Sequence, residues 1–542
     1  MNSNGSQTRH SGHKPLASAA QEASARLIAA LHNPHCYAHA VAQVEVVETH
    51  ASWILLTGEH AYKIKKPVNL GFLDYSTLER RRLACAEELR LNRMLAPELY
   101  LEVVPVSGAV RAPAVNGGGP AIEYALHMRQ FDRAQQLDRL LAAGRLGECE
   151  LDAVADYVAA FHLAAPRVSP NAVYGLPQAV HATARTNLQE LAQLLAGHCS
   201  EEIGRLRAWS DTEFAQHRAL MDVRRAQGWV REVHGDLHLA NLTIYNGKLL
   251  AFDRIEFDAA LRWLDVVSDS AFLVMDLLHH GRRDLAFRFL NRYLEHTGDY
   301  RGLPLLRYHL VYRALVRAKV ARLQAGQMQH AESRRVQARN ADQYMELADS
   351  LRIEVPPRMV LMHGLSGSGK TWVSERLMTY LPALRLRSDV ERKRLHGLAP
   401  GQRSGSEPGG QLYDEEANAR TYTELATLAR IVLAAGYSVI VDAAFLRQWQ
   451  RRLFAELAAQ LMIPWSIVEC RAPHAVLRRR LDGRARVRDE ISEANAAVLD
   501  YQLPTAQPLD SDERRHALYV DSGTPFDAAA MSAAIRAAGG RR

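Results

Sequence analysis

The stretch Gly364-Leu365-Ser366-Gly367-Ser368-Gly369-Lys370-Thr371 decides how the second part of this chain folds. It matches the pattern G-x-x-x-x-G-K-[ST] of a phosphate-binding loop. We expect residues 358–363 before it to form a buried strand and residues 372–380 after it to begin a helix. Glycines let backbone N–H groups wrap a phosphate, and the helix N-terminus adds a favourable dipole. The pattern predicts ATP or GTP binding, with Lys370 at the β- and γ-phosphates and Thr371 holding Mg²⁺.

Composition and charge restrict the classes of protein to consider. The chain has 542 residues, which suggests two to four domains, and its net charge of +7 and apolar fraction of 48% are typical of a globular protein. Its five cysteines are scattered without a C-x-x-C pair, so neither a zinc site nor a disulfide framework is indicated. Residues 1–15 lack the apolar core of a signal peptide, and no apolar run is long enough for a membrane span. We expect a soluble cytoplasmic protein. Nucleic acid remains an open but unsupported partner, and no protein partner is indicated.

About 350 residues precede the phosphate-binding loop. A strand that leads into such a loop normally opens its domain, so these residues should form a domain of their own. The chain shows strand-like runs, an inserted charged helix and then further strands, which is the order of a protein-kinase-like N-lobe. The alternative is an unrelated α+β domain, which this order does not exclude. A mostly helical region follows. The expected elements are strands at 41–49, 52–57, 61–67, 101–106 and 121–130, a helix at 76–95, and helices across 135–226.

A second informative stretch is His234-Gly235-Asp236-Leu237-His238-Leu239-Ala240-Asn241. A short hairpin that turns at Asn246-Gly247 is expected to follow and to deliver Asp253. Phosphoryl transfer needs a carboxylate that orients or deprotonates a hydroxyl, together with oxygen ligands for Mg²⁺. Asp236 fits the first role, and Asn241 and Asp253 fit the second. Alternatively, Asp236 caps a helix and Asp253 is a turn residue, but this order of polar groups favours the catalytic interpretation.

The loop 234–241 closely resembles the H-G-D-x-H-x-x-N motif of the aminoglycoside phosphotransferase and choline kinase superfamily. The resemblance covers roughly residues 35–345 and implies a bilobal kinase fold. It also implies roles for individual residues. These are Asp236 as the catalytic aspartate, Asn241 and Asp253 as Mg²⁺ ligands, Lys63 or Lys65 as the lysine at the α- and β-phosphates, Glu88 (or Glu87) as its helical partner, Met128–Phe131 as a hinge facing adenine, and Asp265 and Asp269 as supports of the catalytic loop.

From residue 358 onward, strand and helix signals alternate, which predicts a parallel α/β sheet. A strand over 383–389 is expected to end at Asp389, and a helix is expected to open at residues 392–394. The apolar strand 438–442 ends in Asp442, an acid at the position where P-loop proteins place a carboxylate near Mg²⁺.

This second region resembles the small P-loop kinases, among them gluconate kinase, shikimate kinase and the zeta-toxin and polynucleotide-kinase group. The resemblance implies that Asp389 and Arg392 bind substrate. It also implies that Arg480 and Arg484 belong to a lid that closes on the transferred phosphoryl group, the alternative being a solvated basic helix. From end to end the chain resembles a bacterial family of two-domain proteins. In that family an aminoglycoside-phosphotransferase-like half precedes a P-loop kinase half.

The sequence thus predicts an α+β bilobal protein-kinase-like domain followed by an α/β P-loop NTPase domain with a parallel sheet. We expect a disordered or helical tail over 1–34, a first domain over 35–350 and a second over 357–542, divided at Pro356-Pro357. The leading hypothesis is an ATP- and Mg²⁺-dependent phosphotransferase with two nucleotide sites. Its substrates would be hydroxyl groups of small polar molecules whose identity the sequence does not give. Two alternatives stay open: a kinase-fold sensor that regulates a P-loop NTPase, and a P-loop half that acts on a polynucleotide end or a nucleotide sugar.

Overall fold

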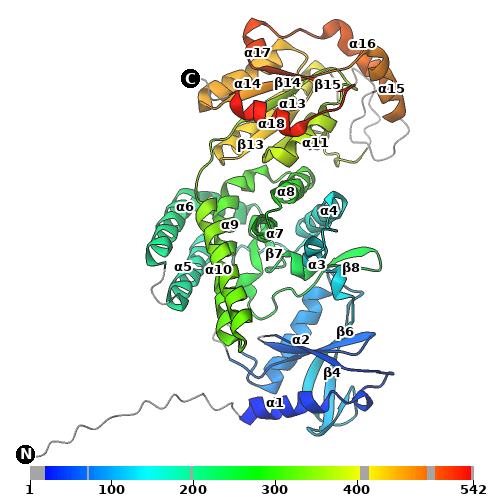
Figure 1. Ribbon diagram of the computed structural model, residues 1–542, viewed down its shortest axis with the longest axis vertical. Coiled ribbons are helices and arrows are strands. Elements are labelled where there is room, and N and C mark those ends of the chain that lie inside the picture. The colour runs from blue at the N-terminus through cyan, green and yellow to red at the C-terminus, as the bar shows by residue number, and fades with distance from the viewer. Residues whose placement is uncertain are drawn as a thin grey trace, which may run out of the picture. The chain divides into compact units, whose positions relative to one another are not determined.

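A computed structural model gives the fold of the chain (Figure 1). Its contacts divide the chain into two compact units, and the predicted boundary near Pro356-Pro357 lies inside the second. Unit 1 contains Met1–Leu140, His234–Asp236 and Ala240–Arg262, and unit 2 contains Leu141–Val233, Leu237–Leu239 and Trp263–Arg542. The structure describes residues 19–49, 51–69, 73–195, 199–402, 414–484 and 495–538.

Unit 1 is built on a six-stranded antiparallel sheet with the strand order β1-β2-β3-β6-β4-β5, drawn in blue and cyan in Figure 1. Five of the strands were predicted, and β5 was not. Helix α2 (Leu78–Asn92) follows β3 as expected, and the side chain of Thr77 caps it by accepting from the N–H of Arg80. The strands are β1 (Glu45–Glu48), β2 (Ser52–Leu56), β3 (His60–Lys65), β4 (Tyr100–Ala109), β5 (Ala112–Val115) and β6 (Ala121–Arg129).

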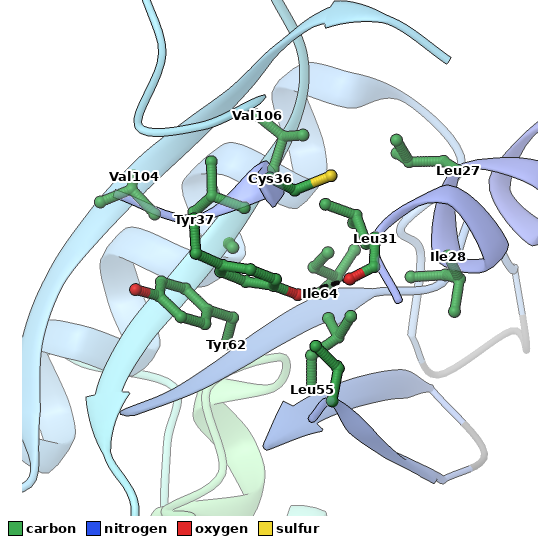
Figure 2. Packing of buried hydrophobic residues seen from close by; sticks show 13 residues of the cluster. Leu27, Ile28, Leu31, Cys36, Tyr37, Leu55, Tyr62, Ile64, Val104 and Val106 are labelled. Carbon is green, nitrogen blue, oxygen red and sulfur yellow. Dashed lines mark hydrogen bonds between the residues drawn. The ribbon is translucent and has the colours of Figure 1, made fainter. Parts of the chain in front are cut away.

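The apolar face of this sheet is covered by the N-terminal segment. Helix α1 (Ala19–Ala30) and the 3₁₀ turn η1 (Pro34–Cys36) pack against it. Figure 2 shows Leu27 and Leu31 beside strand residues of the sheet, and the Tyr37 hydroxyl donates to the Leu31 carbonyl at 2.8 Å. The predicted start of the first domain at residue 35 therefore leaves out a helix that belongs to the core of this sheet.

Two further strands of unit 1 form the hairpin that the sequence predicted. Strands β8 (Leu242–Tyr245) and β9 (Lys248–Ala251) pair antiparallel, with Tyr245 opposite Lys248. Asn246 and Gly247 both have positive φ angles, of 50° and 74°, as a two-residue type I′ turn requires.

Unit 2 begins with a mainly helical region. Arg224 of α6 is buried between the carboxylates of Asp265 (2.7 Å) and Asp299 (2.6 Å). Asp269 contacts the buried ring of His162 at 3.0 Å, so the implied supports Asp265 and Asp269 both hold side chains of neighbouring helices. The longer helices are α4 (Glu148–Ala164), α5 (Pro177–Leu194), α6 (Ser200–Ala226), α7 (Val266–His279), α8 (Arg283–Thr297), α9 (Leu303–Gln327) and α10 (Ala331–Leu351), and β7 (Val230–Glu232) pairs with β10 (Trp263–Asp265).

The rest of unit 2 is a five-stranded parallel sheet in the order β12-β13-β11-β14-β15. The bounds of β13 (Ser438–Asp442) match the predicted strand. Within the parts of the chain that the structure describes, none of the helices has the length and apolar character needed to cross a membrane. The elements are β11 (Met359–His363), α11 (Lys370–Tyr380), β12 (Ala383–Arg387), α12 (Ser388–Leu395), α13 (Glu415–Ala434), β13 (Ser438–Asp442), α14 (Gln448–Leu461), β14 (Trp465–Arg471), α15 (His474–Arg484), α16 (Ala496–Thr505), α17 (Ser511–Arg515), β15 (Ala517–Asp521) and α18 (Ala528–Ala537).

One boundary in this sheet was predicted wrongly. Strand β12 ends at Arg387, so Asp389 does not end a strand but lies in the first turn of α12. Arg392 lies in the last turn of that helix rather than opening it. The acidic residues Asp389 and Glu391 in the first turn, and basic residues in the last, match the helix dipole and favour this earlier start.

Acid should destabilise unit 2 through His309, which lies buried in α9. Burial lowers the pKa of its imidazole to about 4. His309 therefore becomes protonated near pH 6.5 in the unfolded chain but only near pH 4 in the folded chain. Between these two values the unfolded chain binds one more proton than the folded chain. We expect the free energy of unfolding to fall by up to about 3 kcal/mol across this window through His309 alone. Urea unfolding of His309→Gln at several pH values should show a correspondingly shallower loss.

The exposed His330 supplies the control for this prediction, because it lies on the surface of the folded chain rather than in its core. His330→Gln should keep the pH dependence of the wild type. An unchanged slope in His309→Gln would show that His309 does not contribute to acid sensitivity.

Candidate functional site

The predicted catalytic loop is fixed to the hairpin by His234. Its buried ring contacts the Phe252 carbonyl through Nε2 at 2.9 Å, and the N–H of Asp236 donates to Nδ1 at 3.3 Å. A neutral ring with its proton on Nε2 satisfies both contacts. Gly235 has a φ of +86°, and a Cβ there would lie 2.6 Å from the Leu261 carbonyl oxygen. The sequence His-Gly-Asp therefore makes a tight turn that only glycine can complete at its centre.

Asp236 and Asn241 lie together, as the motif predicted. The amide Nδ2 of Asn241 donates to the backbone oxygen of Asp236 at 3.0 Å and to its carboxylate Oδ2 at 3.1 Å. Because Nδ2 faces Asp236, Oδ1 is the atom of Asn241 that can serve as a cation ligand. Carboxylate and amide oxygens are the ligand types that Mg²⁺ takes in proteins, so Asn241 and Asp253 fit this ion chemically.

Asp253 is held in an unusual backbone conformation beside a lysine. Its φ is +63°, a region that residues other than glycine rarely adopt and that is enriched at functional sites. The backbone N–H of Asp253 donates to the Tyr100 hydroxyl at 3.0 Å. Lys63 Nζ donates to Asp253 Oδ1 at 2.6 Å and to Glu88 Oε1 at 2.8 Å. Strand β3, helix α2 and the end of the hairpin thus meet at one ammonium group.

Lys65 also contacts Glu88, and its further partner is Glu256, which in turn accepts from the Tyr75 hydroxyl. Of the two lysines, Lys63 is therefore the one that lies against Asp253. The competing candidate Glu87 pairs instead with Arg90 and Arg262. Tyr100, Tyr75 and Glu256 were not identified from the sequence.

Burial and close carboxylates act in opposite directions on the charged lysines of this cluster. Burial by itself lowers the pKa of the Lys63 ammonium, but the carboxylates of Asp253 and Glu88 outweigh it and hold that pKa well above its usual range. Glu256 and Glu88 do the same for the buried Lys65. Both lysines therefore stay charged at neutral pH. A side chain can neutralise phosphate only when it carries this charge.

An apolar pocket of about 200 Å³ opens beside Lys63 and Asp253 in unit 1. The predicted hinge residues Met128 and Phe131 line it, together with Ile54 and Ala61 from the neighbouring strands. Its size and apolar lining suit a flat ring, and its position beside a lysine and a carboxylate suits a nucleotide.

Removing the charge of Glu256, one of the two carboxylate partners of Lys65, should destabilise unit 1. Lys65 and its other partner Glu88 are fully buried, and Glu256 is nearly so. We expect Glu256→Gln to lower the free energy of unfolding by about 3 kcal/mol, measured by urea unfolding. The control Glu98→Gln breaks the exposed pair with Lys248 and should change stability little. Equal effects of the two changes would contradict a buried ion pair at Lys65.

The phosphate-binding loop of unit 2 has the glycine geometry that its sequence predicted. Gly364 and Gly367 have φ angles of +140° and +82°, and a Cβ on them would lie 2.5 Å from the Cys470 oxygen and 2.9 Å from the Leu477 oxygen. Lys370 Nζ donates to the carbonyls of Gly364 (2.9 Å) and Leu365 (3.0 Å).

A cavity of about 560 Å³ adjoins this loop. Lys370, Thr371, Asp442, Asp389 and Arg392 all line it, so the structure brings the predicted phosphate, metal and substrate residues to one space. The Ser374 hydroxyl contacts Asp442 Oδ2 at 3.3 Å, which ties this carboxylate to helix α11. Thr371 and Asp442 carry hard oxygen ligands and fit Mg²⁺ chemically.

Two further contacts concern the predicted lid. Arg480 donates to the Gly367 carbonyl at 3.2 Å and to the Ser522 hydroxyl at 2.7 Å, so its guanidinium lies against the phosphate-binding loop. Arg484 ends helix α15, and its side chain lies outside the described residues. Gln502 of α16, which the sequence did not single out, accepts from the N–H of Ser366 at 2.8 Å.

Comparisons with known proteins show the family to which the chain belongs. The sequence profile described as an AAA domain (AAA_33) matches residues 359–509. The uncharacterized protein Rv2004c of Mycobacterium tuberculosis (strain ATCC 25618 / H37Rv) is 31% identical over 476 residues, which cover 86% of this chain and 91% of the relative. The uncharacterized protein Mb2027c of Mycobacterium bovis gives the same values.

Solved structures match either part of the chain. A choline kinase from Cryptosporidium parvum Iowa II is 10% identical, covers 57% of this chain and 91% of its own, and has a TM-score of 0.36. A sugar kinase from Janibacter sp. HTCC2649 is 22% identical, covers 31% of this chain and 88% of its own, and has a TM-score of 0.25.

The order of elements and the two loops define a class of protein in which a protein-kinase-like domain precedes a P-loop kinase domain. Within this class, the chain belongs to the family of the mycobacterial proteins Rv2004c and Mb2027c.

Proposed function

We propose that the protein is an ATP- and Mg²⁺-dependent phosphotransferase with two nucleotide sites, one in each kinase-like part. The observation that carries this proposal is the contact of Lys63 with both Glu88 and Asp253 at the mouth of an apolar pocket. A protein kinase holds ATP with a strand lysine that pairs with a helical glutamate and with a nearby aspartate that binds Mg²⁺, and Lys63, Glu88 and Asp253 supply these three side chains.

In the first site, adenine would occupy the pocket lined by Met128 and Phe131. Lys63 would contact the phosphates, and Asn241 and Asp253 would hold Mg²⁺, which supplies charge neutralisation when bound. Asp236 would accept the proton of a substrate hydroxyl while that oxygen forms a bond to the γ-phosphorus. The bond from the γ-phosphorus to the oxygen bridging to the β-phosphate breaks, and ADP leaves with that electron pair.

In the second site, the backbone N–H groups of the loop 364–371 and Lys370 would hold the phosphates. Thr371 and Asp442 would hold the cation, Arg480 would neutralise the transferred group, and Asp389 with Arg392 would orient the acceptor. The acceptor class of both sites is proposed as small polar molecules with hydroxyl groups.

The proposal is tested by ADP release from the full-length chain with MgATP across a panel of hydroxylated metabolites. A compound that stimulates ADP release should appear in a phosphorylated form by mass spectrometry. Stimulation lost in Asp236→Ala assigns the compound to the first site, and stimulation lost in Lys370→Ala assigns it to the second. If ATP binds but no compound is phosphorylated, the phosphotransferase proposal fails and the sensor alternative takes its place.

A further inference from the structure

Strand β12 is the edge strand of the parallel sheet, and a side chain from helix α8 covers part of its free edge. The amide of Asn291 donates through Nδ2 to the Ala383 carbonyl at 3.1 Å, and its Oδ1 accepts from the Arg385 N–H at 2.6 Å. Asn291 thus pairs with the edge as a neighbouring strand would, and it is itself buried. Unpaired edge groups are costly when buried, so this contact fixes α8 to β12.

One turn further along α8, the carboxylate of Glu295 contacts two arginines of strand β12. Its Oε1 accepts from Arg385 Nη2 at 3.2 Å, and its Oε2 lies 3.6 Å from Arg387 Nη1. All three side chains are buried. Glu295 lies well ahead of Pro356-Pro357, whereas both arginines belong to the P-loop sheet.

These arginines lead directly to the residues of the second site. Arg385 Nη1 contacts the Ser374 hydroxyl at 3.4 Å, and that hydroxyl contacts Asp442 Oδ2 at 3.3 Å. Arg387 lines the 560 Å³ cavity beside Asp389 and Asp442. A chain of contacts therefore runs from Glu295 through Arg385 and Ser374 to the carboxylate proposed to hold the cation.

We infer that Glu295, contributed by the helical region of unit 2 that precedes the P-loop sheet, is a positioning residue of the second nucleotide site. It holds Arg385 and Arg387 in place, and through them the position of Asp442 and one wall of the acceptor cavity. The second site is then complete only when α8 lies against β12. This inference rests on the proposed phosphotransferase function of the second site.

Electrostatics agrees with this role. Burial by itself lowers the pKa of the Arg385 guanidinium, but Glu295 first, and then Glu375 and Asp442, raise it above its ordinary value. Without the Glu295 carboxylate, the buried guanidinium would keep only Glu375 and Asp442, the two carboxylates of the P-loop part. Arg385 would then turn toward Glu375 and Asp442, and the contact through Ser374 would be lost.

The test measures MgATP turnover by the full chain in an Asp236→Ala background, so that the second site supplies the signal. Glu295→Gln is expected to raise the Mg²⁺ concentration for half-maximal turnover about tenfold, as changes to residues that support metal ligands typically do. The matched control is Asp284→Asn on the same helix, whose carboxylate pairs with Arg282 at the partly exposed surface. It should leave the Mg²⁺ dependence unchanged.

A double variant separates positioning from general loss of stability. If Glu295 acts through Arg385, then Glu295→Gln combined with Arg385→Gln should shift the Mg²⁺ dependence no further than Arg385→Gln alone. Additive shifts, or a Glu295→Gln chain with unchanged Mg²⁺ dependence, would overturn the inference. If Lys370→Ala in the same background leaves turnover intact, the proposed function of the second site itself fails, which is a distinct result.

Discussion

Asp236→Ala is expected to lower substrate-stimulated ADP release at the first site by about a thousandfold. The carboxylate lies at a glycine turn that His234 ties to the hairpin, and Asn241 donates to one of its oxygens. Asp236 is therefore positioned to receive a proton, whereas the pocket lined by Met128 and Phe131 does not involve it. ATP affinity of the first site should change little. Single-turnover phosphorylation and calorimetric ATP titration on the same samples measure the two quantities separately.

The control for this prediction is Asp258→Ala. Asp258 lies in the same unit and caps the 3₁₀ turn η4 (Ala259–Leu261) through the N–H of Ala260. Its loss should cost some stability and leave the rate of phosphoryl transfer nearly unchanged. Parallel losses of rate and of ATP affinity in Asp236→Ala would assign Asp236 a structural role in the loop instead.

Lys370→Ala is expected to weaken nucleotide binding at the second site about 100-fold. An ammonium that bridges two phosphates makes charge-assisted hydrogen bonds worth roughly 1.5 kcal/mol or more each, and alanine makes none. Calorimetry of the full chain should then show one of two nucleotide-binding events disappear, while the event in unit 1 stays. Arg376→Ala is the matched control, because Arg376 lies on the same helix but stacks on Trp372 and is exposed.

The variants Asp236→Ala and Lys370→Ala together test whether the two nucleotide sites are independent. Each change should remove one activity and leave the other. Loss of all ATP turnover from either single change would contradict two separate nucleotide sites.

Local sequence patterns were enough to find the residues that the structure brings together at the two candidate sites. The glycines of the loop 364–371, the turn at Gly235 and the Asn246-Gly247 hairpin each require a backbone geometry that few other residues adopt. Lys63 and Lys65 stand two residues apart in β3, so period-two alternation places them on one face, where both contact Glu88. That same alternation could not separate the two lysines, because only the approach of Asp253 to Lys63 distinguishes them.

What the sequence did not indicate depends on contacts between distant segments. Tyr100 meets Asp253 across 153 positions, and Glu256 meets Lys65 across 191. Such pairs leave no spacing pattern in a single sequence. Likewise, the start of α12 at Ser388 was missed because strand β12 passes directly into an acidic first turn without a glycine or proline between them.

Helix α1 sets how far this chain can be shortened from its N-terminal side. Leu27, Ile28 and Leu31 close one face of the sheet in unit 1, and they lie ahead of the residue at which the family resemblance begins. A protein expressed from residue 35 would lose the burial of these three side chains, worth about 5 kcal/mol. It would also expose Leu55, Ile64 and Val106 to water as an apolar patch, and such a patch promotes self-association. Expression trials and crystallisation should therefore retain the chain from before Ala19.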